Sequence, residues 1–228
     1  MRTGPLLLAG LLLAGCGDGS GDDAHDLTVF AASSLTDVLP ELAEAWSEQS
    51  GTEPILVFGG SNHLAAQLHD GAPADAFLTA DPRLIPVGVV DVHFASNHLV
   101  LAVPAGNPAQ VTGPDDLGRD DLRVAVCAAE VPCGRATHAL GLPLSPDTEE
   151  ISVRAVVTRL VLDEADVGIV YATDVLAVEG IDGVHGTDLT SAGVEYRAAP
   201  LTAAGNRFVD FLASDTALGI LRNHGFSE

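Results

Sequence analysis

Four short segments of the sequence combine small or hydroxyl residues with the expected start of a helix. They are Ala32-Ser33-Ser34, Gly59-Gly60-Ser61-Asn62, Pro132-Cys133-Gly134 and Ser152-Val153. The first turn of a helix leaves backbone N–H groups without a partner and carries a partial positive charge, so it attracts anions. A serine adds an O–H donor beside the backbone N–H. Together the segments could bind an anion through neutral donors, although each serine alone could simply cap its helix.

Two other kinds of chemistry are open to these residue types. Ser61 could be a hydrolase nucleophile, but the stretch GGSNH around it lacks the second glycine of a nucleophile elbow, and no acid–base partner is evident. Eight histidines and many carboxylates could bind a cation. The pairs His63/His69 and His93/His98 have spacings that do not put both rings on one helical face. We therefore expect neither an enzyme nor a site for a free metal cation.

Strands alternate with helices along the chain, which predicts an α/β fold with a largely parallel sheet. The expected strands are Leu27–Ala32, Ile55–Phe58, Ala76–Thr79, Leu99–Val103, Val124–Cys127 and Gly168–Val170. The expected helices are Leu35–Gln49, His63–His69, Val153–Asp163, Asn206–Leu212 and Ala217–Asn223. In open α/β sheets ligands bind beyond the carboxyl ends of the strands, which is where the four segments lie.

Local signals refine two of these helices. Ser34 and Asp37 resemble a capping box at the start of the first helix. Pro40 should kink that helix, because it removes one backbone donor. Ser152 is placed to cap the helix that begins at Val153.

The chain begins with a segment typical of export. An apolar run from Pro5 to Ala14 follows Arg2, and Leu13-Ala14-Gly15-Cys16 resembles a bacterial lipobox, in which the cysteine is lipidated and the preceding peptide removed. The run is too short to span a bilayer, which takes about 20 apolar residues. We expect a signal peptide over residues 1–15 and, over residues 16–26, a lipidated Cys16 with a flexible polar tether. The alternative is a plain signal peptide with a chance cysteine.

The chain is strongly acidic. Its net charge is −22, and loss of residues 1–15 would remove one positive charge, Arg2, and give −23. All ten basic residues apart from histidine are arginines. Such a surface repels phosphates, which argues against nucleic acid as a partner. An anionic ligand would have to be bound by fixed neutral dipoles in a site that excludes water.

Several segments resemble, in order, the hallmark segments of periplasmic molybdate-binding proteins. They are LTVFAASSLTDVL, FGGSNHLAAQLHDGAPADAFLTAD, NHLVLAVPAGNP, the VPCG turn and VRAVVTRLVLDEADVGIVYATD. The resemblance runs from about Leu27 to Phe226. It implies the two-lobed, type II periplasmic binding protein fold, in which each lobe is a mostly parallel sheet flanked by helices. Lobe 1 would contain residues 27–101 and 199–228, and lobe 2 residues 102–198.

The resemblance also implies a function. The protein would be an extracytoplasmic, lipid-anchored monomer without a cofactor. It would capture molybdate and deliver it to the membrane permease of an ABC importer. A preference for tungstate or another tetrahedral oxyanion is the alternative.

Carried over position by position, the family's oxyanion contacts fall on Ser34, Ser61, Cys133, Val153 and Tyr171. The two serines would donate through hydroxyl and backbone from lobe 1. Lobe 2 would add the backbone N–H groups of Cys133 and Val153 and the phenolic O–H of Tyr171. Where the family usually has alanine this chain has Cys133, but a backbone donor does not depend on the side chain. Only Tyr171 lies outside the helix starts described above, and it could instead pack in the core.

A disulfide between Cys127 and Cys133 is expected. The chain leaves the cytoplasm, where disulfides persist, and lipidation would occupy Cys16. The bridge would hold the turn that aims the Cys133 N–H at the ligand and so preorganise that donor. The alternative is a pair of buried thiols that pack as small apolar groups.

Overall fold

The computed structural model describes residues 27–184 and 189–228. Its strands are β1 (Thr28–Ala32), β2 (Ile55–Gly59), β3 (Ala76–Thr79), β4 (Val92–Pro104), β5 (Val124–Cys127), β6 (Thr148–Glu150), β7 (Val167–Tyr171), β8 (Ile181–Gly183) and β9 (Leu189–Pro200). Its α-helices are α1 (Leu39–Ser50), α2 (Ser61–His69), α3 (Pro132–Ala139), α4 (Val153–Val161), α5 (Ala172–Ala177), α6 (Ala203–Leu212) and α7 (Asp215–Asn223). Short 3₁₀ helices are η1 (Ser33–Leu35), η2 (Pro82–Leu84) and η3 (Pro114–Gly118).

The strands form one continuous sheet whose two ends are parallel and whose middle is antiparallel. Its order is β2-β1-β3-β9-β4-β7-β5-β6, and β8 pairs with β4 off this path. At one end β1 runs parallel to β2 and β3. At the other end β5 runs parallel to β6 and β7. Between them the long strands β4 and β9 pair antiparallel with each other and with their neighbours on either side. The expected α/β fold is confirmed.

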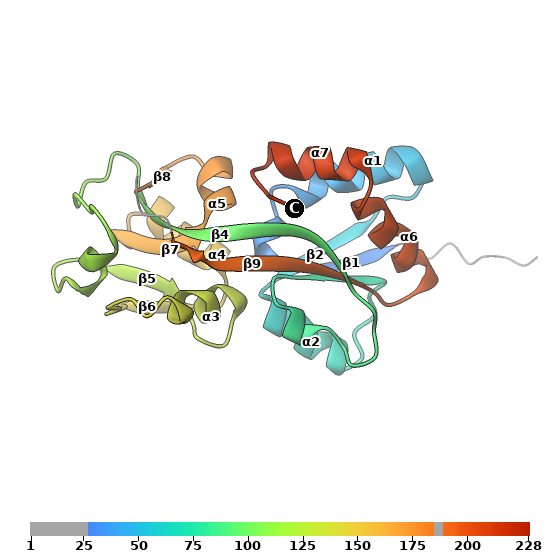
Figure 1. Cartoon of the computed structure of the whole chain (residues 1–228), viewed down its shortest axis with the longest axis horizontal. Helices are drawn as coiled ribbons and strands as arrows, with labels where there is room; N and C mark the ends of the chain where they lie inside the picture. Colours follow the sequence, from blue (N-terminus) through green and yellow to red (C-terminus); the bar gives the residue numbers. More distant parts are fainter. Residues whose placement is uncertain (1–26, 185–188) are drawn as a thin grey trace, which may run out of the picture.

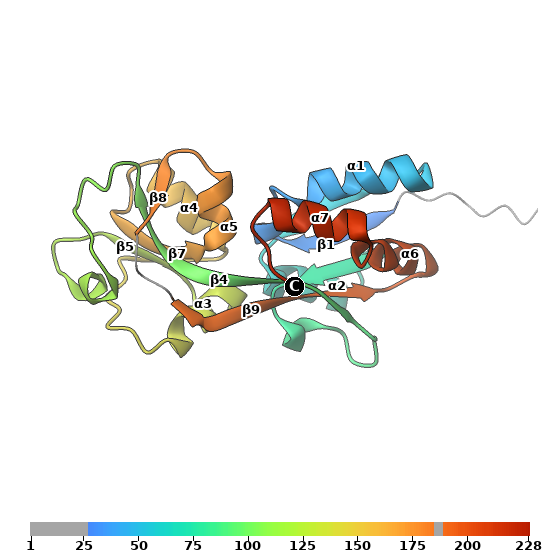
Figure 2. The same ribbon diagram turned by 45° about the horizontal axis from the view of Figure 1, so that its top comes forward.

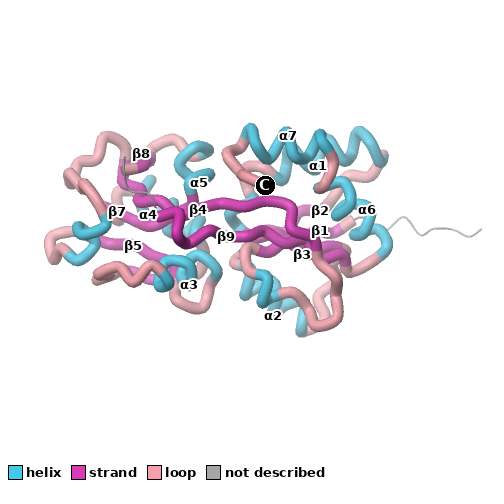
Figure 3. The backbone as a smooth tube through the Cα atoms, viewed as in Figure 1, coloured by secondary structure: helices cyan, strands magenta, loops and turns pink. Residues whose placement is uncertain are grey.

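Two lobes are visible in Figure 1, joined by β4 and β9. Lobe 1 contains β1, β2 and β3, with α1, α6 and α7 on one side of the sheet and α2 on the other, as the turned view in Figure 2 also shows. Lobe 2 contains β5, β6, β7 and β8 with α3, α4 and α5. Figure 3 shows the two connecting strands running side by side from one lobe to the other. The expected division at residues 101/102 and 198/199 falls within these strands and stays a prediction.

Apolar helix faces hold each lobe together. In α4 the buried residues Val153, Val156, Val157 and Leu160 recur at the helical spacing. Ser152 caps this helix as expected, since its Oγ accepts a hydrogen bond from the backbone N–H of Ala155 at 3.3 Å. In lobe 1, Trp46 of α1 packs against Phe208 and Phe211 of α6, with ring centroids 5.6 Å apart in both pairs. Burial of aromatic side chains of this size stabilises the fold by roughly 1.5–3 kcal/mol each.

The start of the first long helix differs from the prediction. The helix was expected from Leu35, with a capping box at Ser34 and Asp37 and a kink at Pro40. In the structure η1 ends at Leu35, and α1 begins only at Leu39, with Pro40 in its first turn. There proline breaks no hydrogen bond, because the first turn has unpaired N–H groups in any case. No side chain caps α1, so the capping box was wrong and Ser34 is available for other contacts.

Other boundaries differ as well, among them the start of α2 and the start of β4. The helix expected from His63 begins at Ser61, because Gly60 takes the cap position with an extended backbone. The strand expected over Leu99–Val103 extends back to Val92, because pairing with β9 stabilises polar residues that carry no strand signal of their own.

Candidate functional site

A small cavity lies between the two lobes. Its walls are formed by the turns that follow the carboxyl ends of β1, β2, β3, β5 and β6, together with the last residue of β7. The lining residues are Ala32, Ser33, Ser34, Gly60, Ser61, Ala80, Val131, Pro132, Cys133, Ser152, Val153 and Tyr171. The structure thus brings all five predicted contact residues to one place, at the edge of the sheets where open α/β folds bind ligands.

Three α-helices have their first residue in the wall of the cavity. They are α2 at Ser61, α3 at Pro132 and α4 at Val153, one from lobe 1 and two from lobe 2. Each contributes first-turn N–H groups that have no partner within the helix and the positive end of a helix dipole. The lobes meet closely here, since a Cβ on Gly60 would lie 2.7 Å from the carbonyl oxygen of Ile151 in lobe 2. Glycine is required at this position by the approach of the other lobe's backbone.

Ser34 and Ser61, two of the four serines that line the cavity, each accept a hydrogen bond from the protein. The hydroxyl of Tyr196 donates to Ser34 Oγ at 2.8 Å, and the backbone N–H of Ala80 donates to Ser61 Oγ at 3.3 Å. Both serines are buried, with 5% and 2% of their surface exposed. A hydroxyl that accepts one such bond still has its own hydrogen to donate. Both serines can therefore act as donors toward the cavity.

Tyr171 is a buried donor that lacks an acceptor. It ends β7, only 1% of its surface is exposed, and its hydroxyl has no hydrogen-bond partner among the described residues. Burial raises the pKa of Tyr171 well above its ordinary value, so the phenol keeps its proton at neutral pH. A buried polar group left unpaired costs about 1–3 kcal/mol, so an acceptor in the cavity would relieve a penalty that the fold already carries.

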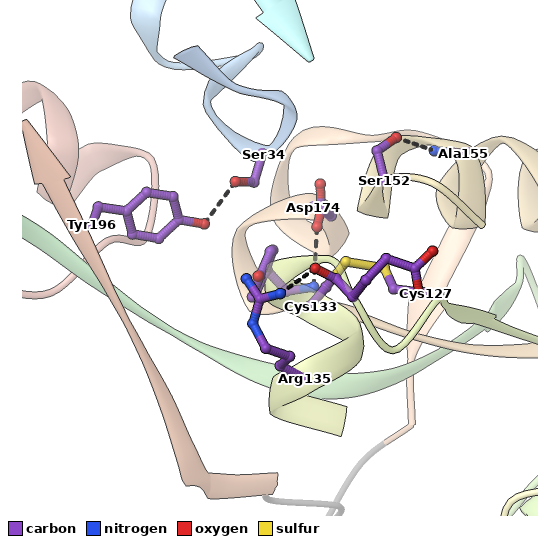
Figure 4. The surroundings of a disulfide bond; sticks show 10 residues. Ser34, Cys127, Cys133, Arg135, Ser152, Ala155, Asp174 and Tyr196 are labelled. Atoms are coloured by element: carbon purple, nitrogen blue, oxygen red, sulfur yellow. Dashed lines mark hydrogen bonds between the residues drawn. A yellow bond between two sulfur atoms is a disulfide. The ribbon is translucent and has the colours of Figure 1, made fainter. Parts of the chain in front are cut away.

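The turn that carries Cys133 is held by a covalent bond and by close packing. Cys127, the last residue of β5, forms a disulfide with Cys133 in the first turn of α3, with their Cα atoms 5.8 Å apart. Figure 4 shows the bridge beside the start of α3. A Cβ on Gly134 would lie 1.8 Å from the carbonyl oxygen of Ala128, so the helix start packs directly on the strand end. The bridge and this packing therefore hold the start of α3 against the end of β5.

The charged side chains near the cavity do not line it. The residues that line it carry no ionisable side chain except the phenol of Tyr171. Asp174 in the first turn of α5 is buried and accepts a hydrogen bond from the backbone N–H of Tyr171 at 3.0 Å. Burial raises the pKa of Asp174 to about 6, although the Tyr171 N–H and the nearby guanidinium of Arg154 act in the opposite direction. The bond holds the backbone of Tyr171 in place.

Sequence reasoning missed one residue of this arrangement. Tyr196 lies on β9 and reaches Ser34 across 162 positions of sequence, as Figure 4 shows. Its ring also packs against that of Tyr171, with centroids 6.3 Å apart. No local pattern indicates such a contact, because it depends on the path of β9 between the lobes.

Within residues 27–184 and 189–228, no three or more His, Cys, Asp or Glu side chains are grouped so as to bind a metal ion. No helix in this part of the chain has the length and apolar composition needed to cross a membrane. The expected signal peptide, the lipid anchor Cys16 and the tether lie outside the described residues.

A cavity between two lobes that are joined by a pair of strands is the arrangement of a type II periplasmic binding protein. The fold is similar to that of the periplasmic molybdate-binding protein of Azotobacter vinelandii, with a TM-score of 0.73 and 20% sequence identity. That likeness covers 89% of this chain and 99% of the other. The predicted fold class is confirmed.

Sequence comparison gives the family. The signature of the bacterial extracellular solute-binding proteins matches residues 27–227, and the chain belongs to this family. It is similar to the molybdate-binding protein ModA of Mycobacterium tuberculosis, with 36% identity over 191 residues, 76% of this chain and 73% of that protein. It is also similar to ModA of Escherichia coli, with 30% identity over 249 aligned positions, 96% of this chain and 95% of that protein.

Proposed function

We propose that this protein captures a tetrahedral oxyanion, molybdate or its near twin tungstate, and delivers it to the membrane permease of an ABC importer. One observation supports the proposal above all. The buried, unpaired O–H of Tyr171 belongs to the wall of the same cavity at which α2, α3 and α4 begin. A donor without a partner, surrounded by further donors, fits a ligand that offers only acceptors.

Five residues would contact the ligand. Ser34 and Ser61 would donate from lobe 1 through their hydroxyl and backbone N–H groups. Cys133 and Val153 would donate backbone N–H groups from lobe 2, and Tyr171 its phenolic O–H. A hydrogen bond to a charged acceptor contributes about 1.5–3 kcal/mol. Neutral dipoles held rigidly in a buried site can therefore compensate a dianion without a charged side chain in contact with it.

The same donors predict the order of preference among anions. Phosphate is partly protonated at neutral pH, and its proton would face a wall that offers donors rather than acceptors. Sulfate carries only acceptor oxygens, so cavity size must discriminate against it. Molybdate and tungstate are nearly equal in size and should bind alike. The similarity to ModA proteins, which are named for molybdate binding, supports molybdate as the first candidate.

The route of delivery follows from family membership and from the N-terminal sequence. A bacterial extracellular solute-binding protein acts outside the cytoplasm. We propose that Cys16 carries a lipid anchor that keeps the protein at the membrane near its permease. Cys16→Ser should move the protein from the membrane fraction to the soluble fraction. A wild-type protein that is already soluble would contradict the anchor and leave the binding site untouched.

A thermal-shift panel tests the proposed ligand class. Molybdate, tungstate, sulfate, phosphate and zinc are each added to the purified protein at one ionic strength. A ligand at 100 times its Kd stabilises the fold by about 2.7 kcal/mol. We expect clear increases in Tm with molybdate and tungstate and smaller ones with sulfate and phosphate. No shift with any oxyanion, or the largest shift with zinc, would contradict the proposal.

A further inference from the structure

An ion pair links the two lobes on one side of the cavity. The Nη1 atom of Arg154, on α4 of lobe 2, lies 2.7 Å from Oδ2 of Asp37, which follows η1 in lobe 1. The same nitrogen lies 3.4 Å from Oδ1 of the buried Asp174 in lobe 2. About 28% of the Arg154 side chain and 31% of the Asp37 side chain are exposed. The guanidinium therefore stays anchored in lobe 2 while it binds lobe 1.

A second ion pair links the lobes near the start of α3. Arg135 on α3 of lobe 2 donates to Asp81, which follows β3 in lobe 1. Asp81 is buried and also accepts hydrogen bonds from Arg83 in its own lobe. Burial raises the pKa of Asp81, but the hydrogen bonds from Arg83 and the charge of Arg135 outweigh this and lower it overall. Asp81 is therefore ionised at neutral pH and available to Arg135.

Three of these four residues are close in sequence to a proposed ligand contact, and the fourth, Asp81, follows a residue that is hydrogen-bonded to one. Asp37 is three positions after Ser34, and Arg154 directly follows Val153. Asp81 directly follows Ala80, whose N–H donates to Ser61, and Arg135 is two positions after Cys133. Separation of the lobes would therefore break the ion pairs and pull apart the two halves of the donor set.

We propose that Asp37–Arg154 and Asp81–Arg135 are closing pairs, which hold the lobes together around the ligand and thereby slow its release. The inference rests on the proposed function, because it assigns to the four side chains a positioning role in oxyanion binding. None of the four lines the cavity, so their effect passes through the approach of the lobes. The Asp37–Arg154 pair is partly exposed, and such ion pairs are weak individually, which suits a contact that must break at each cycle of capture and delivery.

If Arg154 had a purely electrostatic role, loss of its partner Asp37 would have the opposite effect on oxyanion binding. A guanidinium near an anion could act only through its positive charge, without any part in closure. In that case loss of the Asp37 carboxylate would remove a repulsive charge and strengthen oxyanion binding. If the pair closes the lobes, loss of Asp37 weakens binding, although it makes the protein less acidic. The sign of the effect at Asp37 separates the two roles.

The experiment compares Asp37→Asn, Arg154→Gln, their double variant, Arg135→Gln for the second pair and a control, Arg123→Gln. Arg123 pairs with Asp166 at 2.6 Å within lobe 2, so the control removes an equal charge and an ion pair that does not cross between lobes. Affinity for molybdate is measured by calorimetry and release by stopped flow. We expect each single variant to weaken binding about twofold to fivefold through faster release. The double variant should be no weaker than Arg154→Gln, and the control should match the wild type. Unchanged or tighter binding by Asp37→Asn would overturn the inference.

Small-angle scattering gives a readout that does not depend on the ligand. Without added anion, Asp37→Asn and Arg154→Gln should each increase the radius of gyration relative to the wild type and to Arg123→Gln. If the wild type binds neither molybdate nor tungstate but the variants are more extended, the proposed function fails and the closing pairs remain. If the wild type binds molybdate and the variants match it in affinity and in size, the closing pairs fail and the proposed function remains. Should Arg154→Gln fail to fold because Asp174 loses its cation, Asp37→Asn decides alone.

Discussion

Replacement of Tyr171 by phenylalanine should weaken oxyanion binding without weakening the fold. The change deletes one O–H and keeps the ring, which packs against Tyr196. A hydrogen bond to a charged ligand contributes about 1.5–3 kcal/mol, so the Kd should rise roughly 10-fold to 150-fold. Without ligand the hydroxyl of Tyr171 destabilises the wild-type fold, because it is buried and has no hydrogen-bond partner in the described part of the chain. The free energy of unfolding of ligand-free Tyr171→Phe should therefore equal or exceed that of the wild type.

Calorimetric titration with molybdate and urea unfolding of the ligand-free protein give the two quantities. Tyr196→Phe is the matched control, since it also deletes a buried phenolic O–H. That hydroxyl already donates to Ser34, so its loss should destabilise the ligand-free fold by about 1 kcal/mol. Normal molybdate affinity in Tyr171→Phe, or a loss of stability as large as that of Tyr196→Phe, would show that Tyr171 only packs in the core.

Three further predictions concern the donors, the bridge and pH. Ser34→Ala and Ser61→Ala should each lower molybdate affinity by an amount on the order of 1.5–3 kcal/mol, measured by calorimetry; normal binding by both would place the ligand elsewhere. The double variant Cys127→Ser/Cys133→Ser should lose about 2 kcal/mol of stability on the chain-entropy model and bind molybdate more weakly, whereas unchanged affinity would leave the bridge a purely structural role. The pKa of Asp174 is about 6 in the fold, above the ordinary 3.8, so the folded state gains stability as pH falls from 7 through 6 toward 4. Asp174→Asn should be more stable than the wild type at pH 7, by an amount on the order of 3 kcal/mol, and this advantage should shrink as pH falls; a constant difference in urea unfolding would contradict it.

The parts of the site that could be predicted from the sequence are those that depend on local chemistry. Glycine and serine after a strand indicate a helix start, and the structure places Gly60, Ser61 and Ser152 at such starts. The sequence separation of Cys127 and Cys133 is only 6, so a bridge between them needed no knowledge of the fold. A resemblance to known proteins was necessary for Tyr171, because a tyrosine at the end of an apolar strand looks like a core residue.

The parts that could not be predicted are contacts between distant segments. Tyr196 and Ser34 are 162 positions apart, and Asp37 and Arg154 are 117 apart. Their partners are determined by how β4 and β9 carry the chain between the lobes. The capping box at Ser34 and Asp37 failed for the same reason. In the structure Tyr196 donates a hydrogen bond to Ser34, and Arg154 binds Asp37. These tertiary contacts take the place of the local capping hydrogen bonds.

The most direct test of the binding site is a crystal structure of the protein grown with molybdate, with data collected near the molybdenum absorption edge. The anomalous difference map locates the metal of the oxyanion without reference to the protein. We predict one strong peak in the cavity between the lobes, with oxygen atoms within hydrogen-bond distance of Ser34, Ser61, Cys133, Val153 and Tyr171. A peak at any other position, or an empty cavity in protein shown by calorimetry to bind molybdate, would contradict the proposed site.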